Sequence, residues 1–187
     1  LLMHRLSLTN SLRAHIFEPV YRSILPSAFY DGLKIRMVNP MEIFAAKGNA
    51  LITRAAARDL YDWCNMLSEG LFEEQRDLFR KCFLFYMTIS ADTLNKSFDT
   101  SAIDTLDFNK IRRDLFPVLN KKDNFQLDER KKIAKNYISD LMVLTTKEKE
   151  YLDRFEEKKY MPELLFEDAE IVERVKNHPM ALWKCKE

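Results

Sequence analysis

The fold is decided by residues 39–68, which read NPMEIFAAKGNALITRAAARDLYDWCNMLS. The stretch opens with a helix start signal, because Asn39 is a cap residue, Pro40 suits the first helical position, and Glu42 can reach back to the cap. We expect this helix to run to about Thr53. A short break at 54–57 then leads to a second helix at about 58–68, which ends near Gly70.

Downstream of this stretch the sequence is helical, and upstream it is not. Apolar spacing and capping residues predict helices at Leu71 to about Asp92, Asp107–Phe116 (stopped by Pro117), Leu127–Val143, Thr145 (in a capping box) to about Glu157, and Asp168 to about Asn177. Upstream, alternating apolar and polar residues predict strands at Leu6–Thr9 and Lys34–Val38, with connecting segments between them. The expected fold class is mainly α (α+β), a short N-terminal β element in residues 1–38 followed by a helical bundle in residues 39–187.

Composition excludes several classes of protein. The 187 residues include three glycines, too far apart to form a phosphate-binding glycine loop, and their scarcity argues against tight hairpins. A net charge of +1 gives no global attraction to nucleic acid or membrane. The three cysteines have no C-x-x-C spacing, which favours a reducing, cytoplasmic compartment, and no apolar run is long enough to cross a membrane.

The first helix of the 39–68 stretch carries cations in an apolar setting. On a helical wheel its apolar face consists of Ile43, Phe44, Ala46, Ala50 and Leu51. Lys47 and Arg54 fall in the middle of that face. A cation on a buried stripe often marks a functional site, and lysine suits the binding of a phosphate. The alternative is snorkelling, in which the alkyl stem covers the core while the charged head stays in water.

The second helix carries two carboxylates on one side. Asp59 and Asp62 lie three residues apart and share a face opposite the apolar side chains Leu60, Trp63, Cys64 and Leu67. Two carboxylates beside a lysine can act as a general base or hold a metal ion through water. The alternative is a salt-bridged surface in which they pair with Arg54 and Arg58.

Other polar and aromatic residues have simpler interpretations. The basic clusters at 121–122 and 130–132 are solvated helix faces or, as an alternative, a nucleic-acid patch. His178, which precedes a proline, is expected to cap a helix end. Tyr160, Phe166 and Trp183 are expected to anchor the C-terminal tail on the core. The cysteines lack the electropositive neighbours typical of a nucleophile.

The residues around Lys47 resemble the AbiEii/AbiGii toxin family of nucleotidyltransferases. The matching positions are Met41-Glu42-Ile43-Phe44-Ala45-Ala46-Lys47, Ala50-Leu51, Arg54 and Arg58-Asp59-Leu60-Tyr61-Asp62. Residues 10–19, 160–166 and 178–184 also look like the family, so the resemblance covers nearly the whole chain. Its most specific part runs from Lys47 to Asp62.

The resemblance implies a fold similar to that of polymerase-β-type nucleotidyltransferases, together with a set of site residues. In such enzymes a lysine contacts the triphosphate of an NTP and an aspartate assists metal or base chemistry. It therefore implies that Lys47, Arg54 and Arg58 bind nucleotide and that Asp59 or Asp62 is catalytic. The implied cofactors are an NTP and Mg, and the implied acceptor is tRNA or another nucleic acid. The implied partner is an antitoxin protein of a bacterial toxin–antitoxin or phage abortive-infection pair.

The chain departs from the family pattern in its missing motifs. It has no Gly-Ser turn before a strand and no Asp-x-Asp, so we expect no metal ligands in it. These motifs would precede it, which makes it the C-terminal portion of such an enzyme, with 1–38 a remnant of the sheet region. We expect it to be inactive alone and to bind NTP and Mg weakly. Its strands would form a homodimer through their exposed edges or be poorly ordered. The alternatives are a non-catalytic helical interaction module or pseudoenzyme, and a nucleic-acid-binding domain with a contiguous basic face.

Overall fold

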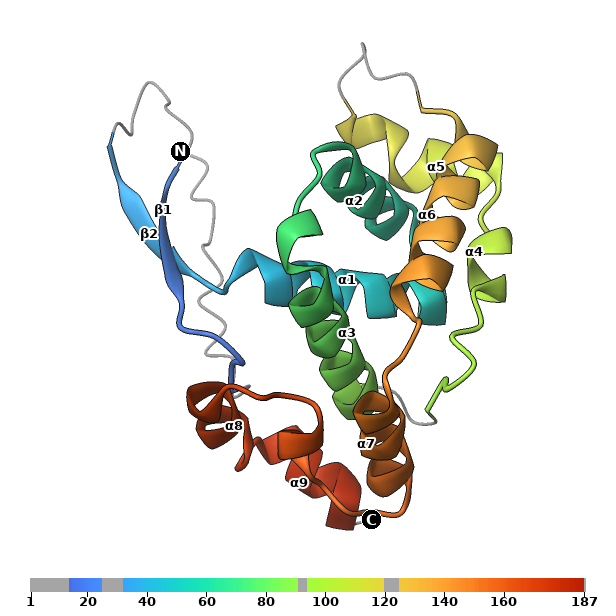
Figure 1. The fold of residues 1–187 in the computed structure, drawn as a ribbon. Coiled ribbons are helices and arrows are strands. Elements are labelled where there is room, and N and C mark those ends of the chain that lie inside the picture. Colours follow the sequence, from blue (N-terminus) through green and yellow to red (C-terminus); the bar gives the residue numbers. More distant parts are fainter. Residues whose placement is uncertain (1–13, 25–31, 91–93, 120–124, 187) are drawn as a thin grey trace.

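The computed structural model describes residues 14–24, 32–90, 94–119 and 125–186. The elements in these ranges are β1 (Val20–Ser23), β2 (Lys34–Met37), α1 (Pro40–Arg54), α2 (Ala57–Ser68), η1 (Glu73–Gln75), α3 (Arg76–Ser90), α4 (Ser101–Asp104), α5 (Phe108–Asp114), η2 (Phe116–Val118), α6 (Leu127–Leu141), α7 (Thr146–Glu156), η3 (Pro162–Leu164), α8 (Ala169–Val175) and α9 (Pro179–Lys186). A short antiparallel sheet precedes a helical bundle (Figure 1), which confirms the expected mainly α (α+β) class.

The sheet is a two-stranded hairpin at one side of the bundle (Figure 1). Its register pairs Val20 with Met37 and Ser23 with Lys34. The predicted strand at Lys34–Val38 is confirmed, whereas its partner β1 falls where the sequence indicates a connecting segment. The strand expected at Leu6–Thr9 lies outside the described residues. Strand β2 pairs with β1 along one edge. Formation of a homodimer through the other edge of either strand remains a prediction.

Helix α1 crosses the middle of the bundle and contacts α2, α3 and α4. Its start is confirmed, since the Asn39 side chain accepts a hydrogen bond from the amide of Met41. The expected role of Glu42 is wrong, because its carboxylate does not reach back to the cap. It is buried instead and accepts hydrogen bonds from the amides of Ile16 and Phe17 and from the hydroxyl of Tyr86. A carboxylate that already has donors from distant segments is not available to its own helix end.

The buried face of α1 differs from the predicted one. It consists of Met41, Glu42, Ala45, Gly48, Asn49, Leu51 and Ile52. Gly48 packs so tightly that an added Cβ would collide with the rings of Trp63 and Phe83. Of the predicted apolar face, Leu51 is buried, while Ile43, Phe44, Ala46 and Ala50 are only partly buried. The predicted stripe is therefore turned away from the centre of the core.

Helix α3 forms the centre of the core and contacts α1, α7 and α9. Every residue from Cys82 to Ile89 is buried, which confirms the expected buried helix. Its start at Leu71 was wrong, because Gly70 (φ 62°) and Phe72 (φ 68°) adopt left-handed backbone and turn the chain before the short helix η1. Gly70 does follow the end of α2, as predicted.

The later helices agree with the prediction where a local cap defines their start. Asp107 caps α5, Thr145 forms the capping box of α7, and Asp168 caps α8. The buried residues of α6 are Ala134, Ile138 and Leu141, whereas Ile133 is 41% exposed. Helices α4 and α9 were not predicted. The start of α4 lacks a side-chain cap, and α9 begins at Pro179, directly after the histidine that we expected to cap the end of the preceding helix.

The C-terminal tail is anchored by two of the three predicted aromatic residues. Phe166 is buried and the Tyr160 hydroxyl donates to the carbonyl of Val175. Trp183 is 48% exposed, so its expected anchoring role is wrong. The ring of His178 does more than end a helix, because it is buried against Phe85 with Nε2 3.1 Å from the carbonyl oxygen of Ala14.

The segment 14–18 is held from both sides. On one side its amides bind Glu42, and on the other His178 contacts Ala14 and Arg174 of α8 forms an ion pair with Glu18. This segment precedes β1, so the contacts fix the base of the hairpin on the bundle. Across the described residues, no helix combines the length and the apolar character needed to cross a bilayer.

Candidate functional site

The end of α1 and the beginning of α2 bring opposite charges together. Ala55 adopts left-handed backbone (φ 48°), and its amide donates hydrogen bonds to the carbonyls of Ala50 and Leu51. These contacts end α1, and the chain then turns into α2. Lys47 of α1 then faces the first turns of α2. Its Nζ lies 2.5 Å from Oδ2 of Asp62 and 3.8 Å from Oδ1 of Asp59. The lysine therefore bridges both predicted carboxylates.

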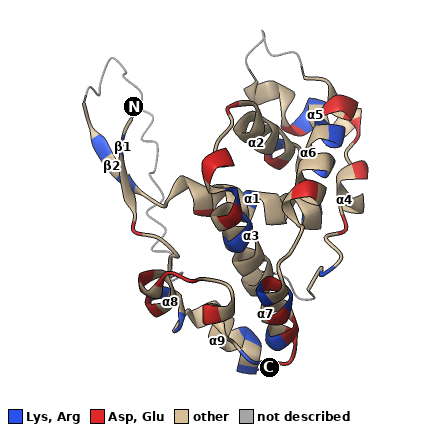
Figure 2. Ribbon diagram, in the orientation of Figure 1, with Lys and Arg blue, Asp and Glu red and all other residues tan. Residues whose placement is uncertain are grey.

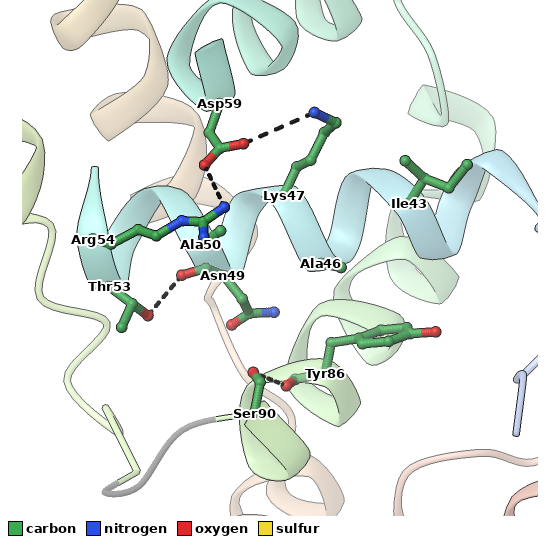
Figure 3. A pocket seen from close by; sticks show the side chains of 10 residues that line it. All are labelled: Ile43, Ala46, Lys47, Asn49, Ala50, Thr53, Arg54, Asp59, Tyr86 and Ser90. Carbon is green, nitrogen blue, oxygen red and sulfur yellow. Dashed lines mark hydrogen bonds and ion pairs between the residues drawn. The ribbon is translucent and has the colours of Figure 1, made fainter. Parts of the chain in front are cut away.

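Asp59 lies between two cations. Its second oxygen, Oδ2, lies 3.2 Å from Nη2 of Arg54, on the side away from Lys47 (Figure 3). The Asp59 side chain is 8% exposed, whereas that of Asp62 is 39% exposed. Asp59 also belongs to the first turn of α2, where the helix dipole favours a negative charge. With two cations and two carboxylates the cluster is neutral as it stands.

The cluster borders a cleft of about 520 Å³. The cleft is lined by Ile43, Ala46, Lys47, Asn49, Ala50, Thr53, Arg54, Asp59, Tyr86 and Ser90, drawn in Figure 3. Much of the stripe that the helical wheel assigned to the core is thus the wall of this cleft. This explains why cations occur in that stripe, because Lys47 and Arg54 extend into an open space rather than into packed side chains. The snorkelling alternative is therefore not needed to explain them.

Asn49 is a cleft residue that the sequence did not single out. Its amide nitrogen donates to the carbonyls of Ala45 (3.0 Å) and Phe83 (2.8 Å), which joins α1 to α3. Its amide oxygen is buried and has no hydrogen-bond partner among the described residues. A polar residue two positions after a predicted site lysine was the only available sequence signal, and it gives no hint of the contact with α3.

Arg58 is the predicted site residue that the structure does not bring to the cluster. Its Nε donates to the backbone carbonyl of Asp114 in α5, 2.9 Å away. Successive side chains on an α-helix point about 100° apart, so Arg58 faces a different side of α2 from its neighbour Asp59. The alternative in which both arginines form salt bridges with these carboxylates is therefore correct for Arg54, which pairs with Asp59, but not for Arg58.

The side chains of the described residues offer little for metal or thiol chemistry. No group of three His, Cys, Asp or Glu side chains within those ranges could hold a metal ion. The cysteines are free, with Cys64 and Cys82 buried and Cys185 partly exposed. Burial raises the pKa of Cys64 to about 11 and that of Cys82 well above its ordinary value. Neither buried thiol is therefore a nucleophile near neutral pH.

The comparisons with known proteins identify a family. Residues 3–157 match a family model described as "Nucleotidyl transferase AbiEii toxin, Type IV TA system". The match includes the whole stretch from Lys47 to Asp62, while the tail at 160–184 lies beyond it. Searches of curated proteins and of solved structures found no match.

Proposed function

Because the chain belongs to the AbiEii family of nucleotidyltransferase toxins from type IV toxin–antitoxin systems, we propose that its cleft binds the NTP substrate of such an enzyme. Lys47 and Arg54 would bind the phosphates, while Asp59 and Asp62 orient the cations and border the reaction centre. In the reaction an acceptor hydroxyl attacks the α-phosphate of the NTP, and pyrophosphate leaves. The single observation that carries the proposal is Lys47 at the cleft, bridging two carboxylates of the next helix.

The two carboxylates differ in what they can do. Asp59 is nearly buried and both its oxygens face cations, so it is a positioning residue for Lys47 and Arg54. Asp62 is more exposed and shares Lys47 with Asp59, so its carboxylate is free to turn toward an incoming group when the lysine binds phosphate. We therefore assign the catalytic role to Asp62.

The charge of the cluster limits what it can bind. A triphosphate carries several negative charges, and the neutral cluster provides no excess of positive charge to balance them. Family members are expected to use Mg for this purpose, but the described side chains do not make a metal site by themselves. Asp62 could contribute one ligand to such an ion, with the remaining protein ligands supplied by other residues of the enzyme. NTP alone is accordingly expected to bind this chain weakly.

Membership of the family suggests the kind of acceptor and partner. We propose that the acceptor is tRNA or another nucleic acid, that an antitoxin protein controls the enzyme, and that it acts in the cytoplasm of a bacterium. Figure 2 shows Lys and Arg positions, interspersed with Asp and Glu, on α5 and α6. Both helices contact α2, which contributes Asp59 to the cleft wall, so a nucleic acid could approach from this side. The chain lacks an Asp-x-Asp, and we propose that these 187 residues alone transfer no nucleotide.

Saturation-transfer NMR of the purified chain with millimolar CTP or ATP and Mg tests the nucleotide site. Signals from the ligand are expected with the unchanged chain and with Arg58→Met, which alters a cation outside the cleft. They are expected to weaken at least tenfold with Lys47→Met, because a charge-assisted contact to phosphate is lost. Equal signals from both variants would contradict the proposed site.

A transfer assay tests the proposed inactivity of the chain alone. Labelled NTP is incubated with the chain and total tRNA, and no label is expected in the RNA. Incorporation of label that Asp62→Asn abolishes would show that the chain is a complete catalyst. If no nucleotide binds but an antitoxin does, the non-catalytic interaction module becomes the better description.

A further inference from the structure

The floor of the cleft contains a buried hydrogen-bond acceptor without a donor. Asn49 is 4% exposed, and its Oδ1 has no partner among the described residues. The orientation of the amide is fixed, because Nδ2 donates to the carbonyls of Ala45 and Phe83. Turning the amide over would place its oxygen against those two carbonyl oxygens. The acceptor is therefore a defined feature of the cleft.

The hydroxyl groups nearby are engaged with backbone carbonyls. Thr53 donates to the carbonyl of Asn49 at 2.7 Å, and Ser90 donates to that of Tyr86. An acceptor that is buried without a donor has lost its hydrogen bond to water without gaining another, which is unfavourable. A ligand that supplies an N–H to Asn49 would recover part of that cost, so the site selects for such a ligand.

The two ends of the cleft differ in chemistry. Figure 3 shows Lys47 and Arg54 on the side of α1 that faces Asp59, and the Asn49 amide on the side that faces Tyr86 and Ser90. One end is thus cationic and suits phosphate. The other is walled by small apolar side chains and an aromatic ring, with one acceptor at its floor, and suits a flat heterocycle with an N–H group.

On the basis of the proposed nucleotide site, we propose that Asn49 Oδ1 accepts a hydrogen bond from the exocyclic amino group of the nucleobase. Asn49 is then a specificity-determining residue, and the cleft takes adenine or cytosine nucleotides in preference to uracil or guanine nucleotides. Uracil carries a carbonyl oxygen where cytosine carries its amino group, and two acceptors facing each other repel. A buried acceptor discriminates strongly between bases for this reason.

Analogues that lack only the amino group test the inference. The dissociation constants of CTP and zebularine triphosphate, and of ATP and purine riboside triphosphate, are measured on the unchanged chain by saturation-transfer NMR. The analogues are expected to bind about five- to tenfold more weakly, the value of one hydrogen bond between neutral groups. Tripolyphosphate is the reference ligand, because it reports the phosphate end alone.

A second readout locates the effect at Asn49. The side-chain NH₂ resonances of Asn49, assigned from their absence in Asn49→Ser, are expected to move on addition of CTP and to move less with zebularine triphosphate. Those of Asn136, which is exposed on α6, are the control. Equal binding of each nucleotide and its analogue would overturn the inference and leave the nucleotide site standing. Absence of binding by tripolyphosphate and by every nucleotide would overturn both.

Discussion

Two charged groups on α1, Glu42 and Lys47, have very different surroundings. Glu42 is 1% exposed, and its two oxygens accept hydrogen bonds from two backbone amides and the Tyr86 hydroxyl, with His15 Nδ1 3.6 Å away. Lys47 has about a third of its side chain exposed and borders an open cleft. One charge is fully enclosed by its donors, while the other is held by carboxylates and remains within reach of solvent.

The difference distinguishes a charge that supports the fold from one that is available to a ligand. A buried carboxylate with satisfied lone pairs is stable in place, and removing it leaves its donors without partners. A partly exposed lysine between carboxylates loses little when it exchanges one anion for another. Both residues lie in the part of the sequence that resembles the family, so resemblance alone does not separate the two roles.

Glu42→Ala is expected to have the largest effect on stability. It leaves the amides of Ile16 and Phe17 and the Tyr86 hydroxyl without an acceptor, at a cost of about 3 kcal/mol in free energy of unfolding. Urea unfolding measures the change, with Glu129→Ala on the exposed surface of α6 as the control. A loss no greater than that of the control would remove the distinction between the two charges.

Gly48→Ala tests the packed face of α1 against its cleft face. The new methyl group collides with Trp63 and Phe83, and overpacking of this kind costs about 1–3 kcal/mol. Ala50→Ser, on the cleft wall, is expected to change the free energy of unfolding by less than about 0.5 kcal/mol. Similar losses in the two variants would mean that the cleft wall is packed as tightly as the core.

Asp59→Asn is expected to have an intermediate effect. It keeps the shape of the side chain but removes the charge that holds Lys47 and Arg54, and it weakens the interaction with the dipole of α2. The expected loss is about 1 kcal/mol in thermal or urea unfolding. Nucleotide binding by the variant is expected to weaken as well, because both cations lose their orientation. A variant that is destabilised but binds nucleotide normally would argue against a positioning role.

Lys47→Met is expected to change stability by less than about 1 kcal/mol, because exposed ion pairs contribute little. The methionine retains most of the apolar stem, Asp59 keeps its ion pair with Arg54, and the more exposed Asp62 can turn toward water. The variant is thus expected to unfold almost like the unchanged chain while nucleotide binding is lost. A large loss of stability would instead place Lys47 with Glu42 among the residues that support the fold.

The smallest effect is expected from the buried thiol of Cys64. Because burial raises its pKa to about 11, its contribution to stability is present below about pH 9 and is lost as the pH rises toward 11. Cys64→Ala is expected to remove that part of the alkaline loss and to leave the slope near neutral pH unchanged. Thermal unfolding between pH 7 and 11 measures it, and an identical pH dependence for both proteins would show that the fold does not raise the pKa of the thiol.

Local signals in the sequence predicted much of the fold. Asn39, Asp107, Thr145 and Asp168 cap helices where expected, because a cap depends on residues within one turn. The start of α3 was misplaced, since a left-handed residue such as Phe72 has no sequence signal comparable to glycine. Strand β1 was missed because it is short and depends on its partner β2 for its hydrogen bonds.

The candidate site was predicted to the extent that it is built by neighbouring helices. Lys47, Arg54, Asp59 and Asp62 lie together, because a short turn joins the two helices that carry them. Asn49 was missed because its partner carbonyl in α3 lies 34 residues along the chain. Contacts of that range rotate α1 about its axis relative to the predicted orientation, which turns an apparent core face into a cleft wall.

The contacts that hold segment 14–18 on the bundle have a consequence for synthesis of the chain. Its contacts to α8 and to His178 join residues 156 and 164 positions apart. A ribosome adds about 5–20 residues per second, so this segment waits about 10–30 s after its own synthesis before its last partners exist. The base of the hairpin therefore docks after the helices have formed. In a nascent chain that stops before α8, segment 14–18 lacks its contacts to Arg174 and His178.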